Sequence, residues 1–188
     1  AEQVRALGEE DFRDRLVPYL ADIYPDPTGD AVQAPLVSAA SFDELSAREQ
    51  EILTAAAPLI QTRIQLLREC RDMLGFLFVS DDDLIIDDRA RTKLKASAGD
   101  VLDAGIHALE GIAAEQWDRD HLEEALKDAI VEGRGMPDGE GIKPRLAYGP
   151  LRVAVTGRQV SPPLFESMEI LGADSTLARL RALRDQLG

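Results

Sequence analysis

Apolar side chains recur every three or four residues over much of this sequence, which is the spacing of helices that bury one face. The first such stretch runs from Glu9 to Ile23, and Pro18 inside it should kink or split the helix. Prolines and a glycine punctuate residues 25–35, so we expect a loop there. The pattern before residue 36 thus predicts a helix and then a turn-rich connection.

Capping signals predict where the next helices begin. Two stretches, Ser41 to Glu44 and Ser46 to Glu49, fit the capping box, in which a hydroxyl and a glutamate three residues later satisfy the first N–H groups of a helix. One of them should start a helix. Pro58 suits the first position of a further helix, which Gly75 would end.

Polar caps divide the second half of the chain in the same way. We expect helix starts at Asp87 or Asp88, at Ser97, at Asp118 or Asp120, at Ser161-Pro162, and at Asp174 or Ser175. The glycine-rich residues 133–141 should form a loop or hinge. Residues 151–156 are ambiguous, because two valines alternate with other residue types at the period of a strand.

Composition favours helices over strands. Hydrophobic residues make up 45% of the chain and aromatic residues only 5%, so leucine, isoleucine, valine and alanine must build the core. We expect nine or ten helices and few or no strands. Cys70 is the single cysteine, which fits a reducing, cytoplasmic compartment. No apolar run approaches the roughly 18–20 residues that a membrane span needs. The chain opens without Met, so we expect an engineered or proteolytic fragment, with removal of the Met by processing as the alternative.

Charge is unevenly distributed along the chain. The formal net charge is −14, which by itself argues against a nucleic-acid partner. Residues 1–142 hold 14 bases and 31 acids, a net of −17, whereas residues 143–188 hold 7 bases and 4 acids, a net of +3. Between Lys143 and Phe165 there are four bases and no acid. A local basic face of this kind can meet phosphates even on an acidic protein.

The residues that could carry catalysis or bind metal do not form a recognisable set. His107 and His121 are the only histidines and lie on different predicted helices, so we read both as structural. The run from Asp81 to Asp83 lacks the ligand spacing of a calcium loop and is expected to be a solvated acidic loop. Cys70 has no identifiable base and should be a buried apolar residue. The sequence therefore gives no positive sign of catalysis or of a metal site.

A series of motifs near the end of the chain resembles a known family. Residues 150–157 read Pro-Leu-Arg-Val-Ala-Val-Thr-Gly, and Ser161-Pro162, Leu164-Phe-Glu and Leu171-Gly172 follow before a leucine-rich helix. This order resembles the end of bacterial glutamyl-tRNA synthetases. Residues 57–64 and 76–78 resemble the first anticodon-binding subdomain of that family. The resemblance is strong after residue 143, fair over 46–95, and weak elsewhere.

The resemblance implies an all-α fold of two helical subdomains, the anticodon-binding helical cage of a class I glutamyl-tRNA synthetase. We expect the first subdomain at residues 1–96 and the second at 97–188, with residues 151–156 helical from Pro150. The partners would be the anticodon arm of tRNA-Glu and the catalytic N-terminal half of the parent chain, with no membrane and a monomeric state. The fragment itself would be non-catalytic and hold no cofactor. The parent would attach glutamate to tRNA-Glu, with ATP and Mg²⁺ bound in its catalytic half.

The resemblance also assigns candidate readers of the anticodon. Arg152 matches an arginine that meets the first base. Ser161 and Pro162 match the pair that meets the middle base, and Leu164 belongs to the same platform. The Ser161 region would also expose free backbone N–H groups as a helix N-cap. Some family members have threonine in place of this serine, and glycine at the position after Pro162.

Further positions concern the third base and the phosphates. Arg63 matches an arginine placed against the third base, where the Glu and Gln anticodons differ as C against G. We therefore hypothesise that the parent enzyme prefers tRNA-Glu to tRNA-Gln. Lys143, Arg145 and Arg158 are the candidates to face phosphates.

Two other functions stay open on the residues alone. The net charge of −14 also fits an acidic, all-helical protein-interaction module without RNA binding, which should expose an apolar groove. A free-standing enzyme is the third possibility, but no catalytic set supports it.

Overall fold

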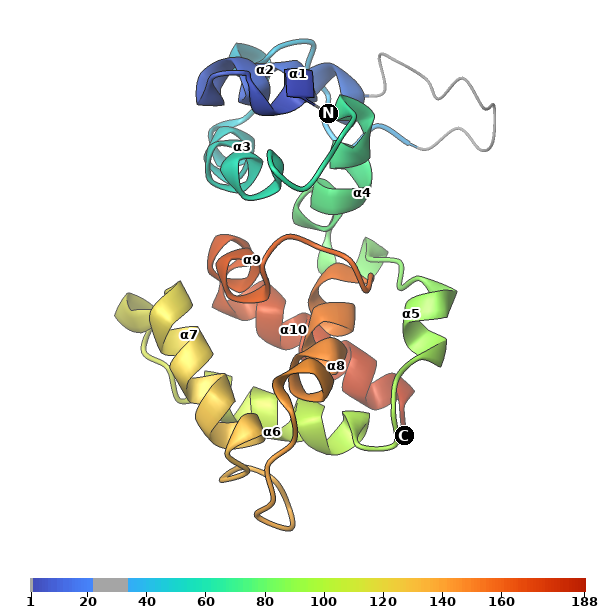
Figure 1. Cartoon of the computed structure of the whole chain (residues 1–188), viewed down its shortest axis with the longest axis vertical. Coiled ribbons are helices and arrows are strands. Elements are labelled where there is room, and N and C mark those ends of the chain that lie inside the picture. Colours follow the sequence, from blue (N-terminus) through green and yellow to red (C-terminus); the bar gives the residue numbers. More distant parts are fainter. Residues whose placement is uncertain (1, 22–33) are drawn as a thin grey trace. The chain divides into compact units, whose positions relative to one another are not determined.

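Every regular element of the described residues is helical. The structure is a computed structural model that describes residues 2–21 and 34–188, and in those ranges it contains no strand (Figure 1). The all-α expectation is confirmed. The chain divides into two compact units, Ala1–Val79 and Ser80–Gly188, whereas the sequence analysis placed the subdomain boundary between residues 96 and 97. Among the helices described, none is long and apolar enough to cross a membrane.

The first unit is a small helical bundle. Its helices are α1 (Glu2–Arg5), α2 (Glu9–Leu20), α3 (Ala47–Ile60) and α4 (Cys70–Leu74), with 3₁₀ turns at Phe42–Glu44, Leu67–Glu69 and Gly75–Leu77. Helix α2 packs against α3 and α4, and the side chains at its centre are fully buried: Phe12, Leu16, Leu20, Leu53, Ile60 and Leu74. The capping box at Ser46 is confirmed, because the Ser46 hydroxyl accepts from the Glu49 N–H and the Glu49 carboxylate accepts from the Ser46 N–H.

Two prolines of this unit lie inside helices without interrupting them. Pro18 does not split α2, which runs unbroken from Glu9 to Leu20. Pro58 does not begin a helix but lies near the end of α3, and the single helix expected from there to Gly75 is replaced by a turn, a 3₁₀ segment and α4. Each proline lies in the last turn of its helix, where it forfeits only one backbone hydrogen bond. Ile23 and most of the loop expected at residues 25–35 lie outside the described residues.

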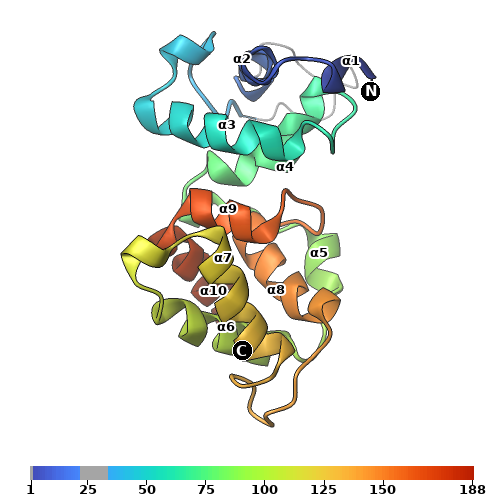
Figure 2. The ribbon, with the colours of Figure 1, turned by 60° about the vertical axis from the view of Figure 1, so that its left-hand side comes forward.

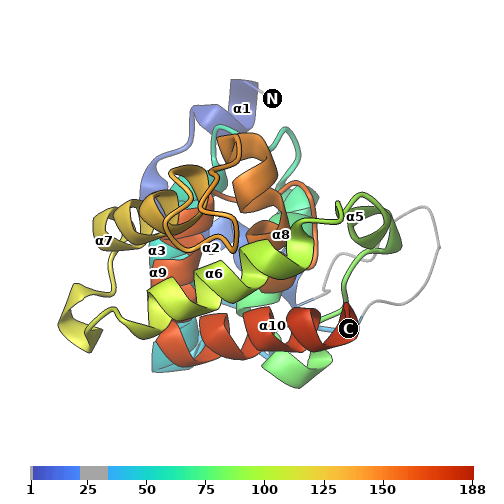
Figure 3. The same cartoon turned by 90° about the horizontal axis from the view of Figure 1, so that it is seen from below.

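The second unit contains the remaining helices. These are α5 (Asp88–Thr92), α6 (Ala98–Glu110), α7 (Arg119–Leu126), α8 (Pro144–Thr156), α9 (Leu164–Leu171) and α10 (Ala173–Gln186), with a π-helical turn at Lys127–Val131 and 3₁₀ turns at Asp81–Asp83 and Ala114–Gln116. Helix α10 lies along α6 and also contacts α8 (Figure 3), while α7 packs on α9 (Figure 2). A Cβ added at Gly105 of α6 would lie 2.9 Å from Cδ2 of Leu151. Glycine therefore permits the close approach of α6 and α8.

Several predicted helix starts in this unit can now be judged. Asp87 and Asp118 cap α5 and α7 through their carboxylates, as expected. Residues 151–156 are helical, but α8 begins at Pro144 rather than Pro150, because Pro144 already supplies the favoured proline at the first turn. The last helix begins at Ala173, directly after Gly172, so neither Asp174 nor Ser175 is its N-cap.

The segment that opens the second unit is tied to the end of α8. The buried Arg179 of α10 donates from Nε to the Asp81 carboxylate at 2.7 Å and from Nη1 to the Val155 carbonyl at 2.8 Å. The Asp87 N–H donates to the Gly157 carbonyl at 2.8 Å. These contacts fix where α8 ends, and they therefore position the loop that follows it.

Candidate nucleic-acid interface

Helix α8 is buried on more than one side along its C-terminal half, from Pro150 to Thr156. Its buried side chains pack toward α6 and α10, and they include Ala147, Pro150, Leu151, Val153, Ala154, Val155 and Thr156. Arg152 interrupts this run and is half-buried. Its side chain is therefore held close to the protein surface while still reaching solvent.

Arg152 is anchored to the loop between α8 and α9, residues 157–163. Its Nη1 donates to the Ser161 hydroxyl at 2.5 Å and to the Pro162 carbonyl at 3.1 Å. Ser161 is only 5% exposed, and its hydroxyl in turn donates to the Pro162 carbonyl at 2.7 Å. The structure thus brings together three of the predicted site residues. These contacts fix the direction of a planar guanidinium, a group suited to base edges.

A second set of hydrogen bonds fixes the start of the same loop. The Thr156 hydroxyl lies 2.8 Å from the Arg152 carbonyl and 3.1 Å from the Arg158 carbonyl, and it accepts from the Arg158 N–H at 3.1 Å. Gly157 has a φ of +75°, and a Cβ there would collide with the Ile85 carbonyl oxygen. Only glycine suits this position, for both reasons.

The predicted N-cap at Ser161 is wrong. Helix α9 begins at Leu164, and Pro163 is its N-cap, without a side-chain hydrogen bond. The two prolines after Ser161 carry no N–H, so positions 162 and 163 cannot supply the free backbone N–H groups that were expected there. The hydroxyl instead contacts Arg152. Leu164 is 3% exposed, so it is packed into the unit at the start of α9.

A cavity of about 640 Å³ opens beside α8. All the charged residues that line it are cations: Lys93, Lys95, Arg145 and Arg152. No aspartate or glutamate is part of its lining. Lys143 and Arg158, which were also phosphate-facing candidates, are exposed but do not line this cavity.

Arg63 belongs to the first compact unit. It lies just beyond the end of α3, is exposed, and donates its backbone N–H to the Ile60 carbonyl at 2.8 Å. It is therefore a turn residue rather than a member of a helix. The structure brings Arg152, Ser161 and Pro162 together in the second unit and places Arg63 in the other.

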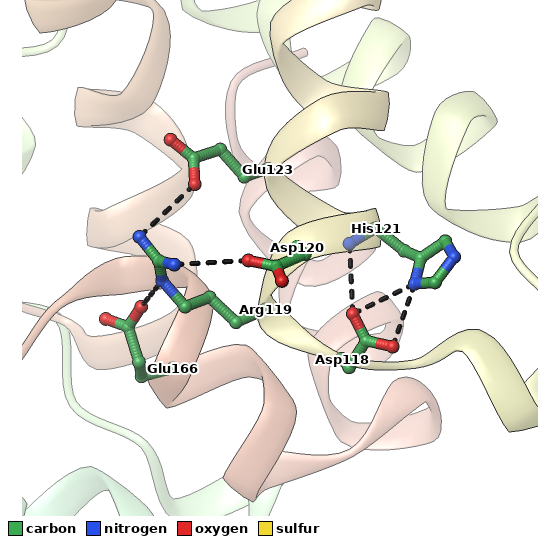
Figure 4. Close-up of polar contacts among 6 residues, drawn as sticks. All are labelled: Asp118, Arg119, Asp120, His121, Glu123 and Glu166. Carbon is green, nitrogen blue, oxygen red and sulfur yellow. Dashed lines mark hydrogen bonds and ion pairs between the residues drawn. The ribbon is translucent and has the colours of Figure 1, made fainter.

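His121 and Cys70 have structural explanations. Nδ1 of His121 lies 2.8 Å from the Asp118 carboxylate, which also accepts from the His121 backbone N–H (Figure 4). These contacts lower the pKa of Asp118, chiefly through the backbone hydrogen bond. Burial raises the pKa of Cys70 to about 12, so its thiol stays protonated. No group of three or more metal-ligating side chains gathers anywhere in the described part of the chain.

An arginine of α7 connects that helix to α9. Arg119 forms an ion pair with Glu166 of α9, and its guanidinium also contacts Asp120 and Glu123 (Figure 4). The Glu166 contact is the main cause of the raised pKa of Arg119. The charge of Arg119 is therefore neutralised by carboxylates of the protein itself.

Lys93 and Lys95 were not among the sequence candidates. A signal for them exists, because residues 89–99 contain four bases and no acid. The net charge of residues 1–142 is negative despite this basic run, because Asp87 and Asp88 precede the run and many other acids lie further away. The net charge of residues 89–99 taken alone identifies this segment as basic.

Comparison with known proteins identifies the family. A family described as an anticodon binding domain matches residues 11–184. Glutamate–tRNA ligases of Bifidobacterium adolescentis and Kocuria rhizophila are each 49% identical, over 100% and 98% of this chain. The alignments cover 34% and 32% of those ligases, so this chain spans about a third of their length.

Solved structures agree on the fold. A crystal structure of a glutamate tRNA ligase from Elizabethkingia meningosepticum matches 100% of this chain and 31% of that chain, with a TM-score of 0.62 and 14% identity. A second structure, from Elizabethkingia anophelis, covers 98% and 30% with a TM-score of 0.58 and 12% identity. The helical arrangement is thus that of a region of these ligases.

Proposed function

We propose, because this chain belongs to the anticodon-binding domain family, that it binds the anticodon arm of tRNA-Glu as part of a glutamate–tRNA ligase. The identity of 49% to ligases of two genera supports this assignment. The parent would attach glutamate to tRNA-Glu in the cytoplasm, and this chain would supply recognition rather than chemistry. The acidic interaction module is not adopted, since the family match favours an RNA-binding role.

Anticodon reading is assigned to the α8–α9 region. Arg152 would contact the first anticodon base, and Ser161 and Pro162 would contact the middle base. Leu164, which is buried, would support the same surface. The observation that carries this assignment is the anchoring of Arg152 Nη1 by Ser161 and Pro162 beside a cation-lined cavity. An arginine held in one direction can discriminate between base edges, whereas a mobile one would mainly attract phosphate.

Ser161 and Pro162 acquire a double role in this proposal. The Ser161 hydroxyl and the Pro162 carbonyl both accept from Arg152, so they are positioning residues for the arginine as well as candidates for the middle base. Unstacked anticodon bases expose the edges that such groups can contact. Reading of the first and middle bases would therefore be coupled through one hydrogen-bond network.

The third base and the phosphates are assigned to other residues. Arg63 would lie against the third base, and the parent would then favour tRNA-Glu over tRNA-Gln. Lys143, Arg145 and Arg158 would face phosphates. The net charge of −14 means that the isolated chain should bind weakly and with strong salt dependence.

The catalytic half of the parent would bind ATP and Mg²⁺. We assign neither group to this chain, because the family that it matches is described as an anticodon binding domain. The partners of this chain would be the catalytic half of the ligase and tRNA-Glu. The ligase would act as a monomer.

The proposal is tested by fluorescence anisotropy of labelled tRNA-Glu titrated with the chain at low salt. Replacing the first anticodon base should weaken binding to the unsubstituted chain. The Arg152→Ala variant should bind both RNAs with nearly equal affinity. Arg134→Ala, which removes a cation of the same unit that already pairs with Asp128, is the matched control and should keep the preference. Equal binding of both RNAs by the unsubstituted chain would overturn the proposal.

A further inference from the structure

The cavity beside α8 has an unusual electrostatic lining for this chain. Acids outnumber bases by 35 to 21 in the whole sequence, yet the charged lining residues of the cavity are four bases and no acid. Two of the bases, Lys93 and Lys95, follow α5, and the other two, Arg145 and Arg152, come from α8. Segments about 50 residues apart thus converge to make one positive site.

Three of these cations make no polar side-chain contact within the described residues. The side chains of Lys93, Lys95 and Arg145 have neither a hydrogen bond nor an ion pair there. Other cations of this unit do pair with carboxylates: Arg119, Arg134, Arg179, Arg181 and Arg184. An unneutralised group of cations in a concave site concentrates positive potential and attracts anions.

The walls between the cations suit a nucleobase. Tyr148, Gly149 and Pro150 contribute aromatic and apolar surface and a position without a side chain. A volume of about 640 Å³ is within the roughly 300–1,000 Å³ of sites that hold small organic ligands. A bare phosphate would need far less room, whereas a nucleotide has both a flat base and a charged group.

We propose that Lys93, Lys95 and Arg145 bind the backbone phosphate of a single-stranded RNA nucleotide that occupies this cavity. The inference rests on the proposed function and adds Lys93 and Lys95 to the site. Lysine acts on phosphate as a flexible point charge, and arginine adds a planar donor set. Arg152, anchored at the same cavity, is then directed at the base while the other three cations neutralise the backbone.

Salt dependence tests the lysines. Binding of a fluorescein-labelled anticodon stem-loop to the whole chain is measured over a salt series for Lys93→Gln and Lys95→Gln. Each variant should reduce the magnitude of the negative slope of log K against log salt, by at most about 0.7, the value for one single-strand phosphate contact. Affinity should fall by the same factor for the Glu anticodon and for a swapped anticodon, since phosphates carry no base identity.

Lys127→Gln is the matched control. It removes the same charge from an exposed position of the same unit that does not line the cavity. Its slope should stay that of the unsubstituted chain. If Lys93→Gln and Lys95→Gln behave like Lys127→Gln, the proposed phosphate site is wrong.

Occupancy of the cavity has its own test at Gly149. A Cβ at this position meets no heavy atom within 4 Å, so larger side chains should be tolerated in α8. Gly149→Met should fill part of the cavity and weaken RNA binding by roughly tenfold, the equivalent of one lost base contact. Gly149→Ala should bind like the unsubstituted chain. Equal affinities of these two variants, with unchanged melting curves, would show that RNA does not enter the cavity.

The two proposals fail in different ways. If the unsubstituted chain shows no preference between the anticodons, the proposed function is contradicted, whatever the salt dependence of the lysine variants. A normal preference with unchanged salt slopes and unchanged Gly149→Met binding contradicts only the phosphate site.

Discussion

Helices α8 and α10 both lie in the part of the chain with a net charge of +3, yet they use their cations differently. On α10, Arg179, Arg181 and Arg184 each pair with a carboxylate on another element. Beside α8, Arg145 has no carboxylate partner among the described residues, and neither do Lys93 and Lys95. Cations of the same unit therefore serve two different purposes. Cations paired within the protein stabilise the fold, and unpaired cations around a cavity indicate a ligand.

The largest expected effect is on the structural side of this comparison. Arg179 is 3% exposed and holds both Asp81 and the Val155 carbonyl. Arg179→Met should lower the free energy of unfolding by about 2–4 kcal/mol, because a carboxylate and a carbonyl lose their partner in a poorly solvated site. Urea denaturation measures this change.

Arg181→Ala is the control for that loss. The Arg181 pair with Glu110 is about half exposed on both sides, so its removal should cost less than about 1 kcal/mol. Equal losses of unfolding free energy in the two variants would mean that burial does not determine how much an arginine stabilises the fold.

The next effect concerns the anchoring of Arg152. Ser161→Ala removes one acceptor of the Arg152 guanidinium while leaving its charge in place. The preference for the Glu anticodon should fall by roughly fivefold, which corresponds to about 1 kcal/mol. The salt slope should not change, because no phosphate contact is lost.

Ser167→Ala controls for loss of a hydroxyl in the same unit. Its hydroxyl donates to the carbonyl of Pro163, the N-cap of α9. A drop in selectivity as large as that of Ser161→Ala would contradict a specific anchoring role.

The smallest effect is a pH dependence in α7. Its cap Asp118 has a lowered pKa in the folded chain because the His121 N–H donates to it. Stabilisation from this carboxylate is therefore present above the ordinary aspartate pKa and disappears as the pH falls through the lowered value. The melting temperature of Asp118→Ala should lie below that of the unsubstituted chain at pH 7, and the gap should shrink below about pH 4.

Asp120→Ala is the neighbour to compare. Asp120 is exposed and pairs with Arg119 rather than with the helix N–H groups. A gap for Asp118→Ala that stays constant with pH would contradict the cap.

Sequence patterns predicted helix identity well and helix ends poorly. Buried stripes and side-chain caps such as Ser46 and Asp118 depend on neighbours in sequence, so they could be read directly. Pro18, Pro58 and Pro150 misled because each lies inside a helix that tertiary packing stabilises despite a lost hydrogen bond. The strand-like period at residues 151–156 reflects burial of α8 on more than one side.

The site was predictable only in part. The resemblance marked Arg152, Ser161 and Pro162, and the structure joins them by hydrogen bonds. It could not indicate Lys93 and Lys95, because their proximity to α8 arises from folding over about 50 residues. That Pro162 and Pro163 lack N–H groups was already readable from the sequence.

The most direct test of the account is an NMR titration of the labelled chain with the anticodon stem-loop of tRNA-Glu. The largest shifts should occur at the Arg152 side-chain Nε–Hε signal and at the backbone amides of the α8–α9 loop and of Lys93 and Lys95. Signals of Arg181 and Arg184 on α10 should change little. Shifts concentrated on α10, with those around Arg152 unchanged, would contradict the claim that the unpaired cations beside α8 form the RNA-binding site.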